Sequence, residues 1–463
     1  MKNIIKWIIT IIAFVLSIVV TISIHNLNII PNKYIIIGSI ILLILNTIAN
    51  LLLFTKKIIP KIFSVIIYIL IIVIAVFGIH FAYTTNNFLD QAFSNTEKQF
   101  SLKYYILSKN EYKESELNNK DIHYLNNIGY VNDAIQKINE KFIVNMIPLE
   151  DPEEVIKNDV FLIDETTIDL LEDSNKIKMS DYHIIYTIDL NYTIEENTPV
   201  NTDAKNKHYY NIFVGGYDFS GYRMDMNKIV TINTETNEVL ITNIHRFAYL
   251  EVPGYGKRDT LSSMGSYGIN NNIAALEELL DIKFDYYLVA YATSLPTLID
   301  DIGGIEYCSD KEYTTYHTTT LDYKDDKGYK VHVKKGCQQL NGIEALTVAR
   351  EREAFYWGAV ERDNNTTEIM IDILDAMKKP SNLSNYTTIL NDVNGLYVTS
   401  IPRDVITNSS KKILNSKLTI TKQTIDGKNG TNKIHFSNTT GAVQYVYDSS
   451  KNEASAKIKA LDK

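Results

Sequence analysis

Arginine is scarce in this 463-residue chain. Seven of its 46 basic residues are arginine, and none of them precedes position 223. Arginine differs from lysine by a flat, always charged group whose paired N–H donors match phosphate and carboxylate oxygens. A lone arginine most often forms a surface ion pair, but a set gathered in short segments favours an anion-binding site. The arginines are Arg223, Arg246, Arg258, Arg350, Arg352, Arg362 and Arg403.

Acidic residues are missing from the first 89 positions, which contain six lysines. The rest of the chain contains the other 40 basic residues and all 55 acidic residues, so its formal charge is about −15. An acidic surface repels the phosphate backbone of nucleic acids. Binding to nucleic acid through bulk electrostatics is therefore not expected.

Cysteine is limited to Cys308 and Cys337, and no Cys/His spacing of the zinc type is present. The chain also lacks a Gly-x-Ser-x-Gly elbow and a Gly-Lys-Ser/Thr phosphate loop, so these hydrolase and nucleotide-binding motifs are excluded. In an oxidising compartment the two cysteines are expected to form a disulfide, which would contribute about 3 kcal/mol. Two free buried thiols are the alternative.

Long apolar runs are confined to the N-terminal part, at residues 7–24, 34–55 and 62–83. Each run is long enough to cross a hydrocarbon layer of about 30 Å as a helix. A cleaved signal peptide is the alternative for the first run, but the residues after it offer a poor cleavage site. Buried helices of a soluble protein are a second alternative, and three such runs in succession argue against it.

The lysines around these runs predict their orientation. Lys2 and Lys6 flank the first run and three more lysines fill the loop between the second and third, whereas the other loop contains only Lys33. The positive-inside rule then places the N-terminus and the second loop in the cytoplasm. Everything after about residue 84 is expected to be extracellular.

We predict three parts: membrane helices over residues 1–83, an accessory domain over 84–207 and a larger domain over 208–463. The accessory part combines a helical pattern at 130–142 with an alternating strand pattern at 182–194, which indicates a small α+β domain. From residue 208 onward, strands and amphipathic helices alternate. This predicts a layered α/β fold with helices on a mixed central sheet, and ligands of such folds bind at strand ends.

Two aspartates flank a strand–loop–strand junction in the sequence YDFSGYRMDMNK. Asp218 closes the first strand of the larger domain and Asp225 follows seven residues later, with Arg223 between them. The two carboxylates can converge on a divalent ion, and Mg²⁺ binds few carboxylates together with phosphate oxygens. A turn in which the aspartates cap backbone amides is the alternative.

Two further segments place arginines after predicted elements. Arg246 follows a predicted strand, beside His245, which is a candidate catalytic histidine. Arg350 and Arg352 follow a predicted helix, and their i, i+2 spacing puts them on one face only where the chain is extended. We therefore expect the helix to stop near Ala349.

Arg362 is expected to precede the last long helix by a few residues. Together with the other arginines and the two aspartates it would form a pyrophosphate–metal site, in which each charge-assisted hydrogen bond adds about 1.5–3 kcal/mol. Surface pairing of Arg350 and Arg352 with neighbouring glutamates is the alternative.

In the order of these segments the chain resembles the LytR-CpsA-Psr family of bacterial cell-envelope proteins, and most of all its capsule-associated CpsA branch. That branch combines three N-terminal membrane spans, an accessory extracellular domain and a catalytic domain. The motifs that carry the resemblance lie between about residues 209 and 379: NIFVGGYD, GYRMDMNKIVTINTETNEVLITNIHR, YYLVAYATSLPTLIDDIGGIEY, KKGCQQLNGIEALTVARERE and ERDNN.

The resemblance implies a phosphotransferase that moves a glycopolymer from a polyprenyl-pyrophosphate carrier to peptidoglycan, with Mg²⁺ as cofactor and Mn²⁺ as the alternative ion. It implies a multi-pass protein of the bacterial cell membrane, with capsule-assembly proteins as further partners. The family's metal-binding aspartates match Asp218 and Asp225. Its pyrophosphate-binding arginines match Arg246, Arg350 and Arg352, with further matches at Arg223 and Arg362.

The chain departs from the family pattern at several positions. Phe247 stands where the family usually has an aspartate, and Thr260 where it has a lysine; Asn364, Thr366 and Val360 replace an arginine, a glutamine and a further cation. These replacements support a second hypothesis, a catalytically impaired protein that binds polyprenyl phosphate and regulates polymer assembly. A pyrophosphatase-like hydrolase that uses the same site is a third.

Overall fold

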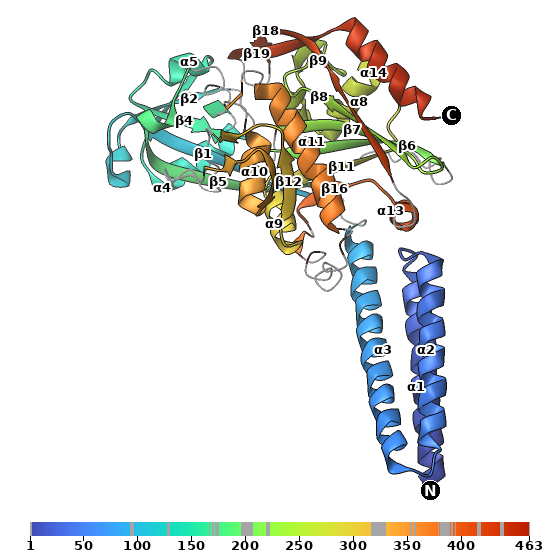
Figure 1. Ribbon diagram of the computed structural model, residues 1–463. Coiled ribbons are helices and arrows are strands. Elements are labelled where there is room, and N and C mark those ends of the chain that lie inside the picture. Colours follow the sequence, from blue (N-terminus) through green and yellow to red (C-terminus); the bar gives the residue numbers. More distant parts are fainter. Residues whose placement is uncertain are drawn as a thin grey trace.

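The computed structural model shows a bundle of three helices joined to a larger globular part (Figure 1). The structure describes residues 2–92, 97–126, 130–165, 167–168, 171, 176–195, 207–218, 223–315, 330–351, 354–355, 358–377, 379, 389, 392–393, 395–413, 418–435 and 439–462.

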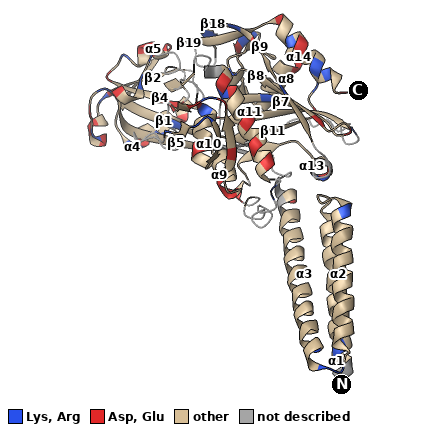
Figure 2. Ribbon diagram, viewed as in Figure 1, with Lys and Arg blue, Asp and Glu red and all other residues tan. Residues whose placement is uncertain are grey.

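The three N-terminal helices coincide with the predicted apolar runs. They are α1 (Lys2–Asn26), α2 (Asn32–Leu53) and α3 (Ile58–Ala92), and each is long and apolar enough to cross a membrane by length and composition. Their charged residues lie near the helix ends (Figure 2). The helices pack on one another through Ala13, Ala49 and Ile71, and most of their other apolar side chains point outward. A helix with apolar residues on all sides suits a lipid environment.

Residues 97–195 form a sheet with its own hydrophobic core. The strand order is β3-β2-β4-β1-β5, and the helix predicted at 130–142 is α4. The elements are β1 (Glu97–Ser108), η1 (Glu114–Leu117), β2 (Asp121–Leu125), α4 (Val131–Lys141), β3 (Asn145–Leu149), α5 (Pro152–Val155), β4 (Val160–Asp164), η2 (Met179–Asp181) and β5 (His183–Glu195). Because this core is separate from the others, the segment is an α+β unit in its own right.

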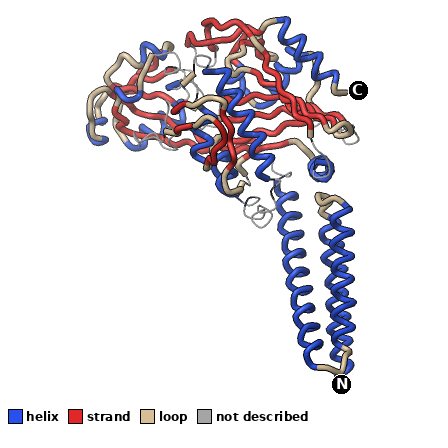
Figure 3. Tube along the Cα trace, in the orientation of Figure 1, coloured by secondary structure: helices blue, strands red, loops and turns tan. Residues whose placement is uncertain are grey.

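A six-stranded mixed sheet organises the larger part (Figure 3). Its order is β16-β11-β6-β7-β8-β17, with β11 parallel to β6 and β17 parallel to β8, while β7 runs antiparallel to both neighbours. The strands are β6 (Tyr209–Tyr217), β7 (Met224–Asn233), β8 (Glu238–Ile244), β11 (Tyr286–Tyr291), β16 (Tyr397–Thr399) and β17 (Thr419–Ile425).

Helices cover both faces of this sheet, as the predicted α/β layering requires. α8 (Ile269–Leu280) and α14 (Asp448–Ala460) share a core with one face. α13 (Arg403–Ile413) packs on the other face through Val405, and α11 (Gly358–Met377) contacts that face through Thr367. The alternation of residues along β7 explains both cores, because Ile229 faces α8 and Val230 faces α13.

The remaining elements surround the sheet. They are β9 (Tyr249–Val252), β10 (Lys257–Thr260), α7 (Leu261–Met264), η4 (Gly265–Tyr267), α9 (Ser294–Asp301), β12 (Ile305–Ser309), β13 (Tyr313–Thr314), β14 (His332–Val333), β15 (Gly336–Leu340), α10 (Gly342–Arg350), β18 (Gly427–Ile434) and β19 (Thr439–Val446). A disulfide joins Cys308 and Cys337, which lie directly opposite each other on β12 and β15.

One element begins earlier than its sequence pattern predicted. The expected last long helix extends back to Gly358, so Arg362 lies within α11 rather than before it. The early turns of α11 are rich in polar residues, which hid the helical period. Tertiary contacts of this polar segment, described below, hold it in the helix.

Candidate functional site

Several of the predicted site residues meet at one end of the central sheet, because β7 runs antiparallel to both β6 and β8. The end of β6 lies beside the start of β7, where Tyr217 faces Met224. The end of β8 lies on the other side of the same start, where Asn243 faces Lys228. A residue at the beginning of β7 is therefore close to whatever follows β6 and β8.

Asp225 occupies this central position and binds two arginines through one carboxylate oxygen. Its Oδ2 accepts from Arg246 Nη1 at 2.7 Å and from Arg362 Nη2 at 3.1 Å. Its Oδ1 accepts from the Ser262 hydroxyl at 2.9 Å and lies 3.8 Å from Arg223 Nη2. In the described part of the chain, these are the three arginines within ion-pair distance of Asp225.

The arginine charges control the ionisation of Asp225. Burial alone would raise the pKa of Asp225, but the charges of Arg246, Arg362 and Arg223 outweigh it and hold that pKa well below its usual range. Arg223 is 1% exposed and Arg246 is 8% exposed. Three guanidinium groups around one carboxylate leave a local excess of positive charge, which suits a ligand with several phosphate oxygens.

Asp218 lies at the base of the loop that precedes this cluster. Its carboxylate accepts a hydrogen bond from the Arg223 backbone N–H at 3.3 Å, and its own N–H donates to the Arg223 carbonyl at 2.9 Å. These two bonds close the loop between β6 and β7, so capping of backbone amides is part of the role of Asp218. Residues 219–222 lie outside the described residues.

Arg350 is the last residue of α10, and Glu351 after it is extended, with φ −66° and ψ 133°. The helix thus ends one residue after the predicted stop. Arg352 lies outside the described residues, so the shared face predicted for the two arginines stays a prediction. α10 is tied to α11 beside this end, because the Asn365 amide donates to the Val348 carbonyl at 3.3 Å.

His245 and Phe247 frame Arg246. The Phe247 N–H donates to His245 Nδ1 at 3.3 Å, and the Arg246 guanidinium carbon lies 4.6 Å from the Phe247 ring centre. Phe247 therefore supports the arginine by a cation–π contact where a carboxylate was expected from the family pattern. Assignment of a catalytic role to His245 stays a prediction.

Sequence reasoning missed Lys228, a buried lysine of β7. Its side chain is almost fully enclosed, and its Nζ donates to Asn243 Oδ1 at 2.7 Å, Thr367 Oγ1 at 2.8 Å and the Asp363 carbonyl at 3.1 Å. All three ammonium hydrogens are thereby used to join β7, β8 and α11. A lysine whose same-face neighbours in a central strand, Met226 and Val230, are apolar was the signal that could have revealed it.

Burial lowers the pKa of Lys228 to about 8, from an ordinary value of 10.5. Between these two values the unfolded chain binds more protons, so stability should rise with pH. Lys228→Met removes this dependence. We expect the free energy of unfolding of wild type, relative to Lys228→Met, to increase by up to about 3 kcal/mol from pH 7 to pH 10.5. The measurement is denaturant unfolding at a series of pH values.

Lys422→Met is the matched control, because Lys422 is a half-exposed lysine of the same sheet. It measures the pH dependence that loss of a half-exposed lysine from this sheet produces by itself, which we expect to be smaller than that of Lys228→Met. A flat difference for Lys228→Met would show that the buried ammonium does not titrate as its burial requires.

Asp363 adds a second buried carboxyl beside the arginines. Burial raises its pKa to about 6, and the nearby charges of Lys228 and Arg362 only partly oppose this. Its Oδ2 is enclosed and makes no hydrogen bond. At this pKa the carboxyl is mostly ionised at pH 7 and becomes protonated as the pH falls through about 6, so at neutral pH it offsets part of the positive charge of the cluster.

In the part of the chain that the structure describes, no three or more His, Cys, Asp or Glu side chains are grouped to hold a metal ion. Asp218 and Asp225 alone are a sparse set of hard oxygen donors. Such a set fits Mg²⁺ when phosphate oxygens of a ligand complete the coordination. The two aspartates thus suit the predicted ion only together with a phosphate-bearing ligand.

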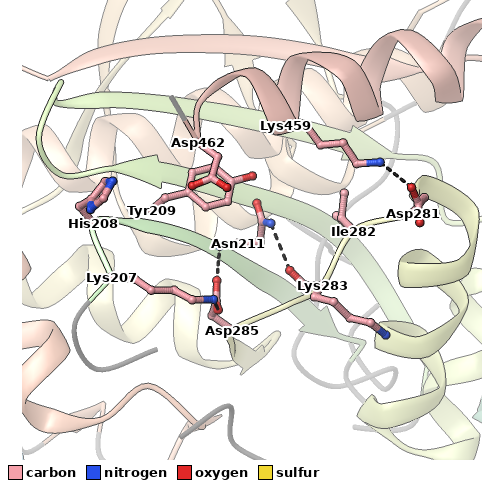
Figure 4. A pocket seen from close by; sticks show the side chains of 10 residues that line it. All are labelled: Lys207, His208, Tyr209, Asn211, Asp281, Ile282, Lys283, Asp285, Lys459 and Asp462. Atoms are coloured by element: carbon pink, nitrogen blue, oxygen red, sulfur yellow. Dashed lines mark hydrogen bonds and ion pairs between the residues drawn. The ribbon is translucent and has the colours of Figure 1, made fainter. Parts of the chain in front are cut away.

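A separate hollow of about 510 Å³ lies at the opposite end of β6 (Figure 4). Lys207 pairs with Asp285 at 2.7 Å and Lys459 with Asp281 at 2.6 Å, and the lining contains as many aspartates as lysines. It therefore lacks the excess positive charge of the arginine cluster and is not the candidate site.

The fold and the cluster define a layered α/β domain with three arginines gathered around one aspartate at the ends of its strands. Residues 180–461 match the profile of the LytR_cpsA_psr family. The chain belongs to this family.

Two relatives are polyisoprenyl-teichoic acid–peptidoglycan teichoic acid transferases. TagU of Bacillus mycoides is 24% identical over 194 residues, which cover 42% of this chain and 60% of the relative. TagT of Bacillus subtilis is 28% identical over 168 residues, which cover 36% and 50%. The match thus spans about half to three-fifths of the relatives' own length.

Two solved structures are similar to this chain. Protein gbs0355 from Streptococcus agalactiae has a TM-score of 0.48 and 20% identity, covering 57% of this chain and 91% of its own. The structure titled TagT bound to LI-WTA has a TM-score of 0.44 and 20% identity, covering 56% and 92%. The fold assignment rests on the family match.

Proposed function

We propose that this protein is a membrane-anchored phosphotransferase that moves an anionic glycopolymer from a polyprenyl-pyrophosphate carrier to peptidoglycan. The observation that carries the proposal is the convergence of Arg223, Arg246 and Arg362 on Asp225 inside a domain of the LytR_cpsA_psr family. The relatives' names supply the reaction class and the acceptor. An anionic polymer of the cell wall or capsule is the substrate class, and capsule-assembly proteins are further candidate partners.

The arginine cluster accounts for the main electrostatic demand of such a reaction. Cleavage of a pyrophosphate moves negative charge onto the departing phosphate, and fixed guanidinium donors stabilise that charge. Arg246 and Arg362 are held in place by Asp225, so they need little rearrangement to meet a ligand. Arg350 and Arg352 are proposed to bind the same pyrophosphate from the end of α10.

Mg²⁺ is the proposed cofactor, with Mn²⁺ as the alternative, and Asp218 and Asp225 are its proposed ligands. When bound, the ion would supply additional positive charge at the pyrophosphate oxygens. For Asp225 to contribute, it would have to share its oxygens between the ion and its arginines. Asp218 would hold the ion while it keeps the β6–β7 loop closed.

The test uses the full chain in lipid nanodiscs, with a polyprenyl-pyrophosphate-linked glycopolymer and peptidoglycan. We expect Mg²⁺-dependent covalent attachment of polymer, and a requirement for about tenfold more Mg²⁺ in Asp218→Asn than in wild type. Asp281→Asn, at the opposite end of the sheet, is the control and should behave like wild type. Release of polyprenyl phosphate and unattached polymer phosphate, the products of attack by water on the pyrophosphate bond, would indicate the hydrolase instead.

A lipid-binding regulator without catalysis is the second candidate. Both carboxylate oxygens of Asp225 are engaged by protein groups, and Phe247 replaces a carboxylate of the family pattern. This candidate is supported if the nanodisc sample binds polyprenyl pyrophosphate, depends on Arg246 for binding, and attaches no polymer under any metal condition.

A further inference from the structure

α13 contacts the membrane helices at two separate places, and the first is the end of α3. The Arg403 guanidinium donates to the Asp90 carboxylate and to the Asn86 side-chain oxygen. Arg403 is the first residue of α13, so the beginning of this helix is tied to the segment that leads out of the bundle. Figure 1 shows α13 beside the end of the three-helix bundle that is nearer to the globular part.

The second place is the connection between α1 and α2. The Asn28 amide donates to Asn408 Oδ1 at 2.8 Å, and Lys411 Nζ donates to Asn28 Oδ1 at 3.0 Å. These contacts use the later turns of α13. Both halves of one short helix therefore touch the bundle, through segments that are far apart in the sequence.

The opposite side of α13 belongs to the core of the central sheet. Val405 and the preceding Ile401 pack with Tyr210, Ile212 and Tyr286 on β6 and β11. A helix with an apolar face against the sheet and polar contacts to the bundle is fixed from both sides. It links the membrane helices to the sheet that carries the arginine cluster.

We infer that α13 is the docking element that seats the family domain on the end of the membrane helices in one orientation. The docking itself stands on the contacts of α13, and its role in substrate access rests on the proposed function. If the substrate is a polyprenyl lipid, docking through α13 keeps one face of the central sheet next to the bilayer, so the lipid can reach the site while its tail remains in an apolar environment.

Weak contacts suffice for this docking because the two parts are tethered. An exposed ion pair such as Arg403 with Asp90 contributes little by itself. However, α3 ends at Ala92 and β1 begins at Glu97, and the unit of residues 97–195 in turn joins the domain that carries α13 to the bundle within one chain. Covalent connection raises the effective concentration of the two parts, and a few polar contacts can then select one orientation.

The test is crosslinking in native membranes. The chain has two cysteines and they are joined to each other, so an introduced pair reacts on a clean background. Asn28→Cys combined with Asn408→Cys is expected to give an internal crosslink with a short bis-methanethiosulfonate reagent, detected by mass spectrometry. Asn28→Cys with Lys428→Cys on distant β18 is the control. Equal crosslinking of both pairs, or of neither, would overturn the inference.

A charge exchange tests the contact itself. Arg403→Glu should lower the yield of the 28–408 crosslink by about fivefold, and Arg403→Glu with Asp90→Arg should restore most of it. An unchanged yield in Arg403→Glu would show that this pair does not hold the orientation. Thermal unfolding of each variant establishes that the domain remains folded.

Activity separates the two proposals. Arg403→Glu should reduce polymer transfer from a long polyprenyl carrier in membranes while leaving binding of inorganic pyrophosphate unchanged. Equal transfer by Arg403→Glu and wild type would contradict the role in lipid access. If neither protein transfers polymer, the proposed function fails, and the crosslinking result still decides whether α13 docks.

Discussion

Replacing Asp225 by asparagine should destabilise the folded protein by about 3–5 kcal/mol and reduce polymer transfer to background. The carboxylate is the shared counter-ion of Arg223, Arg246 and Arg362, and Arg223 is almost completely buried. Asparagine keeps the size of the side chain but removes its charge. Three guanidinium groups would then repel one another in a poorly solvated place.

The stability that Asp225 contributes should depend on pH. Because the pKa of Asp225 is held well below its usual range, its contribution to stability is present above the unfolded value near 4 and is lost as pH falls toward the folded value. The stability difference between wild type and Asp225→Asn should therefore be constant from pH 5 to 8 and shrink below about pH 4. Denaturant unfolding at several pH values measures it.

Ser262→Ala is the matched control for Asp225→Asn, because it removes an uncharged donor from the same carboxylate and leaves the carboxylate charge in place. It should cost about 1.5–3 kcal/mol, less than Asp225→Asn, and leave the pH dependence of wild type in place. If the two variants were equally stable at pH 7, the carboxylate would not be the counter-ion that holds the cluster together.

Replacing Arg246 by alanine should weaken binding of a polyprenyl-pyrophosphate analogue about 100-fold. The guanidinium lies at the end of β8, is fixed by Asp225 and Phe247, and is poorly hydrated. It can give two charge-assisted hydrogen bonds to phosphate, each of about 1.5–3 kcal/mol. Titration of the full chain in nanodiscs, with and without Mg²⁺, measures the change.

Two further variants make the Arg246 result specific. Arg246→Lys retains the charge without the planar fork and should lie between wild type and alanine. Arg258→Ala removes an arginine that donates to the Tyr249 carbonyl and does not contact Asp225, so it should bind as wild type does. Equal losses in Arg246→Ala and Arg258→Ala would point to general charge instead of a site, and no loss in either would remove Arg246 from the ligand contacts.

Much of the architecture could be predicted from short-range patterns. An apolar run of about twenty residues has few alternatives to a membrane helix, and all three runs form helices long and apolar enough to cross a membrane. The alternation of strand and helix patterns after residue 208 likewise predicted a mixed sheet with helices on both faces. These features depend on residues close together in the sequence, so composition and period are sufficient to find them.

Part of the candidate site was also accessible from the sequence. Scarce arginines placed at the ends of predicted strands marked Arg223 and Arg246, and their convergence follows from the antiparallel order of β6, β7 and β8. Arg362 was named as a ligand but placed before its helix. The polar residues that open α11 obey no hydrophobic period, so their helical state depends on contacts with the sheet.

Only the tertiary structure revealed what binds these residues to one another. No spacing in the sequence indicates that Asp225 is shared by three arginines, that Lys228 reaches Thr367, or that Arg403 meets Asp90. Each contact joins segments separated by up to hundreds of residues and depends on side-chain direction. The sequence determined which residue types were available, and the packing of the sheet against α11 and α13 decided which of them meet.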